Sequence, residues 1–352
     1  MNTSETKDIF ITSRVCLAPM AGFTDAPYRL ICREFGADFC VTEMVSADGL
    51  VRAGDKTRRI MERLEGEGPV GVQLFGSDPG ILAEAAKIVE ETGPAFIDLN
   101  FGCPVKKVTR RNGGVAIMRD LDLMEQICSR VVQAVNLPVT AKIRSGWSAV
   151  EENYIEAGRV AQGAGCAAVA IHARYRTQGF SGNATWAHIA KLRSELDIPV
   201  IANGDVKEPE DYFKIVDETG CTLVMIGRGA FGRPWIFREI KDRLSSGEGS
   251  RDLESSEREL SERNSSDREP PGGMALSGRL DILSRFLEME IAWKGEKLAL
   301  LEMRKFYRWF LRGHPGMKKY RMSLVTAETR EAVLGHLSML REEIENKWMK
   351  PA

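Results

Sequence analysis

One cysteine stands between two residues that restrict the backbone in the stretch NFGCPVKK, residues 100–107. Gly102 and Pro104 flank Cys103, and an apolar run, FIDL at 96–99, precedes them. A thiol held in this way at the end of a strand suits a positioned general acid, because proton transfer requires a fixed distance to the reacting atom. The alternative is a small buried hydrophobic residue. We give that interpretation to the other cysteines, Cys16, Cys32, Cys40, Cys128, Cys166 and Cys221.

Polar side chains also end the other apolar runs of the chain. They are Glu43, Gln73, Asn100, Lys142, Arg144, His172, Arg174, Asn203, Asp205 and Arg228. In a barrel of parallel strands, the carboxyl ends of the strands converge on the face that carries catalytic loops. A single polar strand end is common because strand ends meet water, but seven strand ends together indicate a site.

The elements that must position these residues are short apolar runs without the alternation of a half-exposed strand. They lie at 15–19, 39–43, 70–75, 96–100, 139–144, 168–172, 200–203 and 223–227. Amphipathic stretches between them predict helices at 79–92, 121–135, 151–163, 184–195 and 208–219. Eight buried strands alternating with helices predict an α/β fold, a (β/α)8 TIM barrel. A doubly wound open sheet would require a GxGxxG turn after the first strand, and APMAGFTDAP does not supply one.

The 352 residues divide by composition into three segments. We expect a catalytic barrel at 1–244 and a flexible charged linker at 245–278, where few apolar residues could offset the entropy of ordering. A small helical domain follows at 279–352. The net charge of -1 hides an asymmetry, because 245–270 carries eight acids against four arginines while 304–321 carries seven basic residues and no acid.

The cysteine and hydropathy patterns suggest a compartment. Seven cysteines without a CxxC pair exclude a disulfide framework and a zinc site, and they fit a reducing environment. The N-terminus lacks a signal pattern, and no apolar run reaches the ~20 residues of a membrane span. We therefore expect a cytoplasmic protein, a monomer, with no metal and no membrane contact.

The loops after the last two strands favour a phosphate. NGDV at 203–206 and GRGAFGRPW at 227–235 bring glycines to the positions where barrels commonly bind phosphate through backbone N–H groups. A planar ligand with hydrogen-bonding edges and a phosphate points to FMN, with Lys142 near the edge where negative charge collects on reduced flavin. Lys142 could equally form a Schiff base in an aldolase, but an aldolase has no need of Cys103.

A family resemblance follows from seven motifs. They are APMAGFTDAPYR (18–29), VQLFG (72–76), DLNFGCPVKKV (98–108), AKIRSGW (141–147), IHARYRTQGFSG (171–182), IANGDV (201–206) and IGRGAFGRPWIF (226–237). The chain resembles the tRNA-dihydrouridine synthases, most nearly the bacterial B-type branch. The resemblance runs over 10–244 and resumes over 279–340, where MRKFYRWFLRGHPGMKKYR is similar to the helical-domain signature of the family. The stretch between them is longer and more charged than the family usually has.

The resemblance implies a reaction and a set of site residues. FMN reduced by NADPH or NADH would deliver a hydride to C6 of a D-loop uridine in tRNA, and Cys103 would protonate C5. The implied cofactor-binding residues are Pro19, Met20, Ala21, Gln73, Lys142, His172, Asn203, Gly204, Asp205, Gly227 and Arg228. Asn100 and Arg174 would face the uridine.

Basic residues supply the predicted tRNA contacts, because phosphate binding and base stacking need cations interleaved with aromatic side chains. They are Lys106, Lys107 and Arg110 beside the cysteine loop, and Arg304, Lys305, Lys318, Lys319 and Arg321 in the helical domain. Most of the aromatic residues there are expected in the core. A basic helical face can also be ordinary solvated surface. A uracil inside folded tRNA must be flipped out to reach a barrel pocket.

Two other classes of function stay open. A dihydroorotate- or dihydropyrimidine-type flavoprotein would use the same barrel on a free base, but it would have no use for a basic helical domain. A non-catalytic tRNA-binding protein would need neither Cys103 nor Lys142. Bound flavin, and activity on tRNA against orotate, would separate these possibilities.

Overall fold

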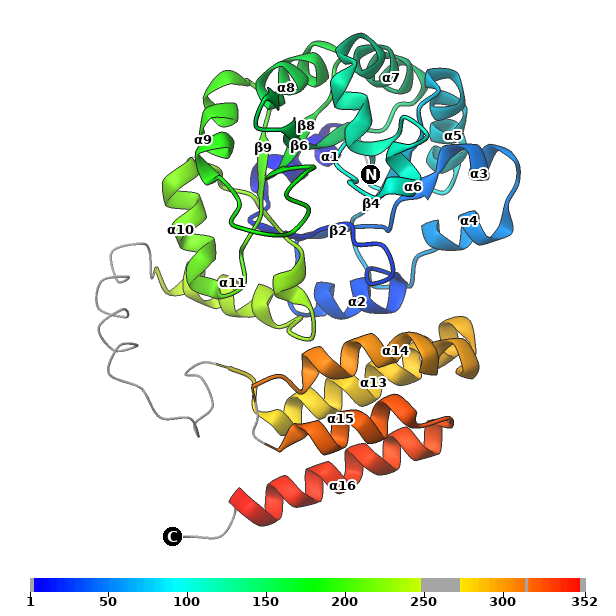
Figure 1. Ribbon diagram of the computed structural model, residues 1–352, viewed down its shortest axis with the longest axis vertical. Coiled ribbons are helices and arrows are strands. Elements are labelled where there is room, and N and C mark those ends of the chain that lie inside the picture. Colours follow the sequence, from blue (N-terminus) through cyan, green and yellow to red (C-terminus); the bar gives the residue numbers. More distant parts are fainter. Residues whose placement is uncertain (1–2, 248–272, 314–315, 349–352) are drawn as a thin grey trace. The chain divides into compact units, whose positions relative to one another are not determined.

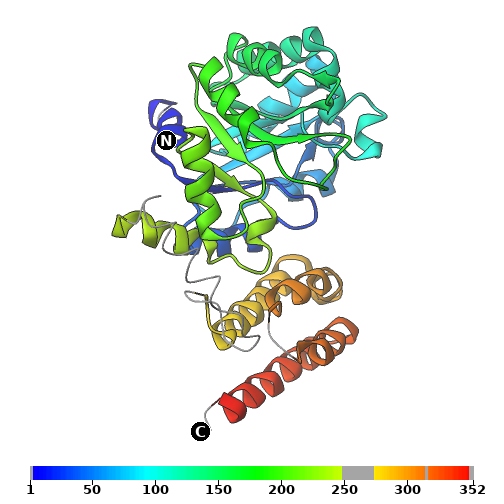
Figure 2. The same ribbon diagram turned by 60° about the vertical axis from the view of Figure 1, so that its left-hand side comes forward.

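The computed structural model describes residues 3–247, 273–313 and 316–348, and the chain divides into two compact units, Met1–Gly229 and Ala230–Ala352. The first unit is a closed barrel of eight parallel strands with helices outside them (Figure 1, Figure 2). The strands are β1 (Val15–Leu17), β2 (Phe39–Val41), β4 (Val70–Phe75), β5 (Phe96–Asn100), β6 (Val139–Ser148), β8 (Ala168–Tyr175), β9 (Val200–Asn203) and β10 (Val224–Ile226). All eight correspond to predicted runs.

The strand register closes the barrel. Each strand pairs in parallel with the next, and β1 also pairs with β10, where Cys16 lies opposite Met225. Nearly every residue of these strands is buried, because helices cover the outside and side chains fill the inside. The predicted TIM barrel is confirmed, and the open sheet is excluded.

Helices precede, connect and follow the strands of the barrel. They are α1 (Thr3–Thr12), α2 (Ala26–Glu34), α3 (Ala47–Val51), α4 (Asp55–Met61), α5 (Pro79–Glu91), α6 (Lys106–Thr109), η1 (Gly114–Arg119), α7 (Leu121–Ala134), α8 (Tyr154–Gly163), α9 (Trp186–Glu195), α10 (Pro209–Thr219) and η2 (Arg228–Ala230). Local signals set their ends. Asp78 and Asp120 cap α5 and α7 by accepting from Ile81 and Leu123 N–H groups at 2.9 and 3.0 Å. Gly220 ends α10 in the left-handed conformation that glycine adopts without cost.

Two short strands depart from the expected pattern. β3 (Val45–Ser46) pairs in parallel with β4, and β7 (Glu151–Glu152) pairs antiparallel with the extended end of β6. The helix predicted over 151–163 is therefore wrong at its start, since the chain turns back as a hairpin before α8. Gly146 permits the hairpin, because a Cβ there would lie 2.4 Å from the carbonyl oxygen of Glu151.

The amino-terminal end of the barrel is packed with aromatic rings. Phe10 of α1 meets Phe39 and Phe96 edge to face, with ring centroids 5.9 and 5.1 Å apart. These rings join a buried cluster with strand residues such as Cys16 and Ile201. Burial of apolar side chains therefore stabilises this end of the strands, which leaves the opposite ends to carry polar groups.

The second unit is helical. Its elements are α11 (Ile236–Ser246), α13 (Leu276–Lys294), α14 (Glu296–Phe310), α15 (Met317–Thr326) and α16 (Arg330–Trp348). α13 packs on α14 through an edge-to-face contact of Phe286 with Phe306, and α15 packs on α16 (Figure 1). The segment before α11 joins the same unit, because Phe231 and Trp235 contact Trp309 and Phe310 of α14.

The contact boundary at Gly229 differs from the predicted domain end at residue 244, since the packing assigns α11 to the helical unit. Most of the predicted linker, 248–272, lies outside the described residues. Its first residues belong to α11 and its last to α13. In the described part of the chain, no helix has the length and apolarity that crossing a membrane requires.

Candidate active site

The loop that carries Cys103 follows β5 and is held by hydrogen bonds on several sides. The backbone N–H groups of Gly102 and Cys103 donate to Asn100 Oδ1 at 3.2 and 2.9 Å. Arg144 Nε donates to the carbonyl oxygen of Gly102 at 2.8 Å, and Val115 N–H donates to that of Cys103 at 3.2 Å. The position of the thiol is thus set by the backbone on both sides of it.

Partial burial keeps this thiol protonated. Desolvation raises the pKa of Cys103 above its usual value, although a backbone hydrogen bond from Val105 and the charge of Arg144 act against the shift. The side chain remains partly exposed, whereas the other six cysteines are buried. Cys103 can therefore present a proton to a molecule at the end of the strands, and the interpretation of the other six as core residues is confirmed.

Three side chains on β4 and β5 form a hydrogen-bonded chain leading to the cysteine loop. Asn100 Nδ2 donates to Gln73 Oε1 at 2.7 Å, and Gln73 Nε2 donates to Asp98 Oδ2 at 2.6 Å. Asp98 also accepts from Thr140 Oγ1 at 2.6 Å. Gln73 and Asn100 were predicted site residues, but Asp98 was not. An acid two residues before Asn100 within a buried strand, and so on the same face, is the signal that could have found it.

Lys142 of β6 crosses the interior to β9. Its Nζ donates to Asn203 Oδ1 at 2.9 Å, although β8 lies between the two strands. Burial lowers the pKa of Lys142 to about 8, and the nearby carboxylate of Asp98 opposes this shift. Asn203 Nδ2 in turn donates to the carbonyl oxygen of Met225 at 2.7 Å. The lysine therefore lies inside the barrel, at the strand ends, within a set of amide groups.

Arg174 and Asp205 form an ion pair that the sequence did not predict. Arg174 Nη2 donates to both carboxylate oxygens of Asp205, at 2.8 and 2.7 Å, and to the carbonyl oxygen of Gly182 at 2.7 Å. The Arg174 side chain is 1% exposed. The buried guanidinium therefore holds the β8–α9 loop against the turn after β9. The predicted contact of Arg174 with uridine stays a prediction.

His172 lies beside this pair. Its Nε2 is 3.2 Å from Arg174 Nη1 and must accept there, because a guanidinium has only donors. Burial lowers the pKa of His172 well below its usual value, and the charges of Lys142, Arg144, Arg174 and Arg228 act in the same direction. The imidazole is therefore neutral at pH 7.

The turn after β9 has the shape and charge to hold a phosphate. Gly204 has φ +135°, and a Cβ there would lie 2.7 Å from Ala184 Cβ and 3.3 Å from His172 Cδ2. The Arg174 guanidinium neutralises the Asp205 carboxylate, so this carboxylate would not repel an anion at the turn. Arg228 lies 3.5 Å from Asp205, with 42% of its side chain exposed. These residues fit the predicted phosphate group, with Asp205 contributing through its backbone.

The loop after β1 closes the same end of the barrel. Pro19 and Met20 are half-buried and Ala21 is exposed. Met20 Sδ lies 3.5 Å from the position that a Cβ on Gly227 would occupy, so the methionine and this glycine are neighbours. The structure thus brings the loops after β1 and β10 together, as the predicted cofactor-binding set requires.

The predicted tRNA-binding residues differ in how free their charges are. Lys106, Lys107 and Arg110 are exposed on and just after α6. In the second unit, Lys318 is exposed, whereas Lys319 pairs with Glu343 of α16 at 2.9 Å and Lys305 lies 3.6 Å from Glu302. Arg304 and Arg321 are half-buried. The acid-free stretch 304–321 therefore receives acids from outside its own sequence. Tyr307, Phe310 and Tyr320 are buried, which confirms that most aromatic residues here are core.

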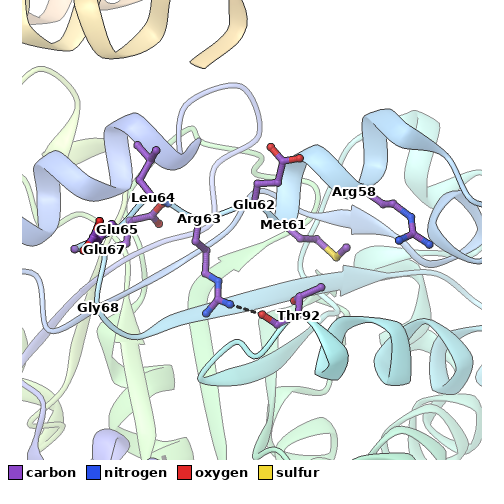
Figure 3. A pocket seen from close by; sticks show the side chains of 10 residues that line it. Arg58, Met61, Glu62, Arg63, Leu64, Glu65, Glu67, Gly68 and Thr92 are labelled. Carbon is purple, nitrogen blue, oxygen red and sulfur yellow. Dashed lines mark hydrogen bonds between the residues drawn. The ribbon is translucent and has the colours of Figure 1, made fainter. Parts of the chain in front are cut away.

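A pocket of about 580 Å³ lies elsewhere on the first unit. It is formed by the last turn of α4, by the segment between α4 and β4 and by Thr92 before β5, at the amino ends of these strands (Figure 3). Arg63 reaches across it to the carbonyl oxygens of Thr92 and Gly93, the latter at 2.7 Å. None of the predicted site residues lines this pocket, so it belongs to the end of the barrel opposite the strand ends discussed above.

Comparison with known proteins agrees with this geometry. The family model described as dihydrouridine synthase (Dus) matches residues 16–347. The chain is 40% identical over 324 residues to tRNA-dihydrouridine synthase B of Xanthomonas axonopodis pv. citri (strain 306), covering 92% of this chain and 91% of that protein. It is 44% identical over 238 residues to tRNA-dihydrouridine synthase B of Escherichia coli (strain K12), covering 68% of this chain and 74% of that protein.

A solved structure shares the fold at low sequence identity. Histamine dehydrogenase from Rhizobium sp. 4-9 superposes with a TM-score of 0.50 at 13% identity, over 69% of this chain and 48% of that chain. The chain thus spans about half the length of that protein, and the likeness concerns the fold alone. The family match and the identity to full-length relatives go further: the chain belongs to the dihydrouridine synthase (Dus) family.

Proposed function

We propose that this protein is a tRNA-dihydrouridine synthase, an oxidoreductase that reduces the C5–C6 double bond of a uridine in tRNA. The observation that carries the proposal is the protonated, partly exposed thiol of Cys103, held by Asn100 and Arg144 at the carboxyl ends of the strands. Reduction of this double bond needs a hydride on one carbon and a proton on the other. The family membership and the names of the relatives support the same reaction.

The cofactor that fits the barrel is a flavin, which we propose to be FMN reduced by NADPH or NADH. The turn at Gly204 and Asp205, with Gly227 and Arg228, would hold the phosphate, and His172 would lie beside it as a neutral group. Gln73 and Lys142 would bond to the ring edge, and Pro19, Met20 and Ala21 would border it. The bound, reduced flavin supplies the hydride for C6 of the uracil.

The lysine suits the ring edge for an electrostatic reason. Burial lowers the pKa of Lys142 to about 8, and the nearby carboxylate of Asp98 favours the charged form of the lysine. A buried ammonium group stabilises negative charge on a neighbouring ring more strongly than an exposed one, since the effective dielectric constant is lower there. Lys142 would thus favour the reduced state of a bound cofactor.

Cys103 acts as the general acid. Its thiol holds a proton at Sγ at neutral pH and would release it to C5 as charge develops there. The guanidinium of Arg144 donates a hydrogen bond to the carbonyl oxygen of Gly102. Its positive charge stabilises the thiolate that remains after proton transfer, because it opposes the rise of the Cys103 pKa that burial causes. Asn100 would contact the uracil through the hydrogen-bonding groups of its side chain that the cysteine loop does not use.

The RNA would be held mainly through phosphate contacts. Lys106, Lys107 and Arg110 lie next to the cysteine loop in sequence and are exposed, so they suit the strand flanking the flipped uridine. In the helical unit, Lys318 is the best-placed cation, with Arg304, Lys305, Lys319 and Arg321 nearby in sequence. We propose that 1–244 catalyses, that 279–352 binds tRNA, that 245–278 joins them, and that the protein works as a cytoplasmic monomer.

The deciding experiment uses tRNA from a strain that lacks dihydrouridine. Incubation with the purified protein, FMN and NADPH should give a mass increase of two hydrogens per modified uridine. Fragment analysis would locate the modified nucleotide. The same reaction with orotate or free uracil should give none. Absence of product on tRNA, with flavin bound, would overturn the proposal.

A second experiment tests the cofactor alone. The purified protein is denatured, and the supernatant is examined for flavin by absorbance and mass spectrometry. One FMN released per chain is the expected result. Absence of any flavin, together with failure to take up FMN on reconstitution, would contradict the assignment of the phosphate turn and of Lys142.

A further inference from the structure

Asp98 is an acid within the buried strand β5, and none of the roles proposed above uses it. It is 2% exposed, and each of its oxygens accepts one hydrogen bond, from Thr140 Oγ1 and from Gln73 Nε2, both at 2.6 Å. Buried acids are uncommon in proteins because desolvation disfavours their charge. A buried carboxylate at this position therefore needs a structural explanation.

The hydrogen bonds that link Asp98 to the cysteine loop can be satisfied in one direction only. At one end, an ionised carboxylate only accepts, so Gln73 must turn its Nε2 toward Asp98. At the other end, the backbone N–H groups of Gly102 and Cys103 only donate, so Asn100 must turn its Oδ1 toward them. The remaining amide atoms, Asn100 Nδ2 and Gln73 Oε1, then meet as donor and acceptor at 2.7 Å. Both ends impose the same orientation.

We propose that Asp98 is a positioning residue, which fixes the orientation of the Gln73 and Asn100 amides and thereby holds the loop that presents Cys103. Its catalytic consequence rests on the proposed function, whereas its effect on the loop does not. Asp98 itself does not touch the reacting atoms.

These hydrogen bonds explain why a neutral, apolar side chain could not replace Asp98. Without an acceptor at position 98, Gln73 can reverse its amide, which places its Nε2 against Asn100 Nδ2. If Asn100 reverses as well, its Nδ2 faces the N–H of Cys103. In either case two donors meet in a buried site, which proteins avoid. Arg144 and Val115 still hold the carbonyl oxygens of the loop, so the loop should loosen rather than unfold.

The accessibility of the Cys103 thiol measures directly how firmly its loop is held. Cys103 is the one partly exposed cysteine of the seven, so native-state alkylation with iodoacetamide followed by mass spectrometry measures its accessibility alone. Replacement Asp98→Leu should raise the alkylation rate about five- to tenfold, the effect of losing about one net hydrogen bond. Asp98→Asn should give a smaller rise, because the amide keeps one acceptor oxygen but can face either way.

The pH profile of the alkylation rate distinguishes a looser cysteine loop from a general loss of stability. Burial raises the thiol pKa, so a looser loop should move the midpoint of the alkylation profile in Asp98→Leu down toward that of a free cysteine. The matched control is Glu67→Gln, which alters another buried acid, paired with Arg29 at 2.8 Å and outside this set of contacts. It should lower stability and leave both the alkylation rate and its midpoint unchanged.

A double-mutant cycle tests whether Asp98 acts through Asn100. Asn100→Ala should raise alkylation like Asp98→Leu, and the double variant should be no faster than the faster single variant. Additive effects, or a wild-type rate and midpoint in Asp98→Leu, would overturn the proposal. If Asp98→Leu fails to fold, as alkylation of the six buried cysteines would reveal, the same criteria apply to Asp98→Asn. Because no RNA is involved, failure here is distinct from failure of the proposed function.

Discussion

Arg174 of β8 and Asp205 after β9 form an ion pair in which one guanidinium nitrogen, Nη2, lies 2.8 and 2.7 Å from the two carboxylate oxygens. The Asp205 carboxylate also accepts from the backbone N–H of Ala184 at 2.7 Å. Three segments of chain, from the end of β8 to the turn after β9, therefore meet on one pair of charges. This relationship makes Arg174 part of the scaffold of the turn that we propose to hold a phosphate.

The ion pair predicts a stability effect. Arg174→Met should destabilise the protein by about 3 kcal/mol, because it leaves a largely buried carboxylate with only the half-exposed Arg228, 3.5 Å away, as an ionic partner. Urea unfolding measures the loss. Arg119→Met is the matched control, since Arg119 pairs with Glu151 at the surface and should contribute less than about 1 kcal/mol. The double change Arg174→Met with Asp205→Asn should recover much of the loss, and equal losses at both arginines would contradict the assignment.

Cys103→Ala should separate the two half-reactions. Flavin reduction by NADPH involves no proton donor on the pyrimidine side, so that step should keep nearly its normal rate. Dihydrouridine formation should fall by about 10²–10⁴-fold, which is the usual contribution of general-acid catalysis. Stopped-flow absorbance follows the first step and mass spectrometry of tRNA the second. A variant that reduces tRNA uridine at the wild-type rate would make Cys103 merely structural.

Gly114 predicts a positional effect on the same thiol. It has φ +59°, and a Cβ there would lie 2.6 Å from the carbonyl oxygen and 3.0 Å from the Cβ of Cys103. Gly114→Ala should therefore displace Cys103 and lower dihydrouridine formation about tenfold or more, while flavin content stays unchanged. Gly163→Ala is the control, because a Cβ at Gly163 meets no atom within 4 Å. Equal activity in the two variants would show that the loop tolerates the shift.

Neighbouring lysines of α15 should differ in their effect on tRNA binding. Both lysines are exposed, but Lys319 is paired with Glu343 and lies over the ring of Tyr320, whereas the described residues show no ion pair for Lys318. Lys318→Glu should therefore weaken tRNA affinity more than Lys319→Glu and should lower the slope of log affinity against log salt by about 1. Filter binding across a salt series measures both. Oxidation of NADPH without tRNA should be unaffected, and an unchanged salt slope for both variants would mark this face as ordinary surface.

The buried acid predicts a pH dependence of stability. Burial raises the pKa of Asp98 from 3.8 to about 6. Between these values the folded chain holds a proton that the unfolded chain has lost, so this group lowers the free energy of unfolding as pH rises through that window and adds no further loss above it. Asp98→Asn should remove this contribution. Urea unfolding between pH 4 and 7 should show a smaller decline in the variant, and parallel curves would refute the shifted pKa.

Local sequence patterns predicted the strands of the barrel and the ends of several helices. Each barrel strand is a short run buried on both faces, and helix ends are marked by residues such as Asp78, Asp120 and Gly220, so neighbouring residues alone predict them. The start of the helix predicted at 151 was one exception. There the hairpin depends on β6 extending beyond the barrel, which the two glutamates of β7 do not signal.

The sequence by itself also determined the chemical inventory of the site, because strand ends must converge once the barrel closes: Cys103, Lys142 and Asn203 could be named in advance. Only the tertiary structure decided which of these groups form hydrogen bonds and ion pairs with one another. Asp98 joins Gln73, Arg174 joins Asp205, and Glu343 reaches Lys319, over separations of 24 to 31 residues in the chain. The physical reason is that burial and hydrogen bonding depend on the distances between side chains in space, and a charge that looks free within its own stretch can be neutralised by a partner from another element.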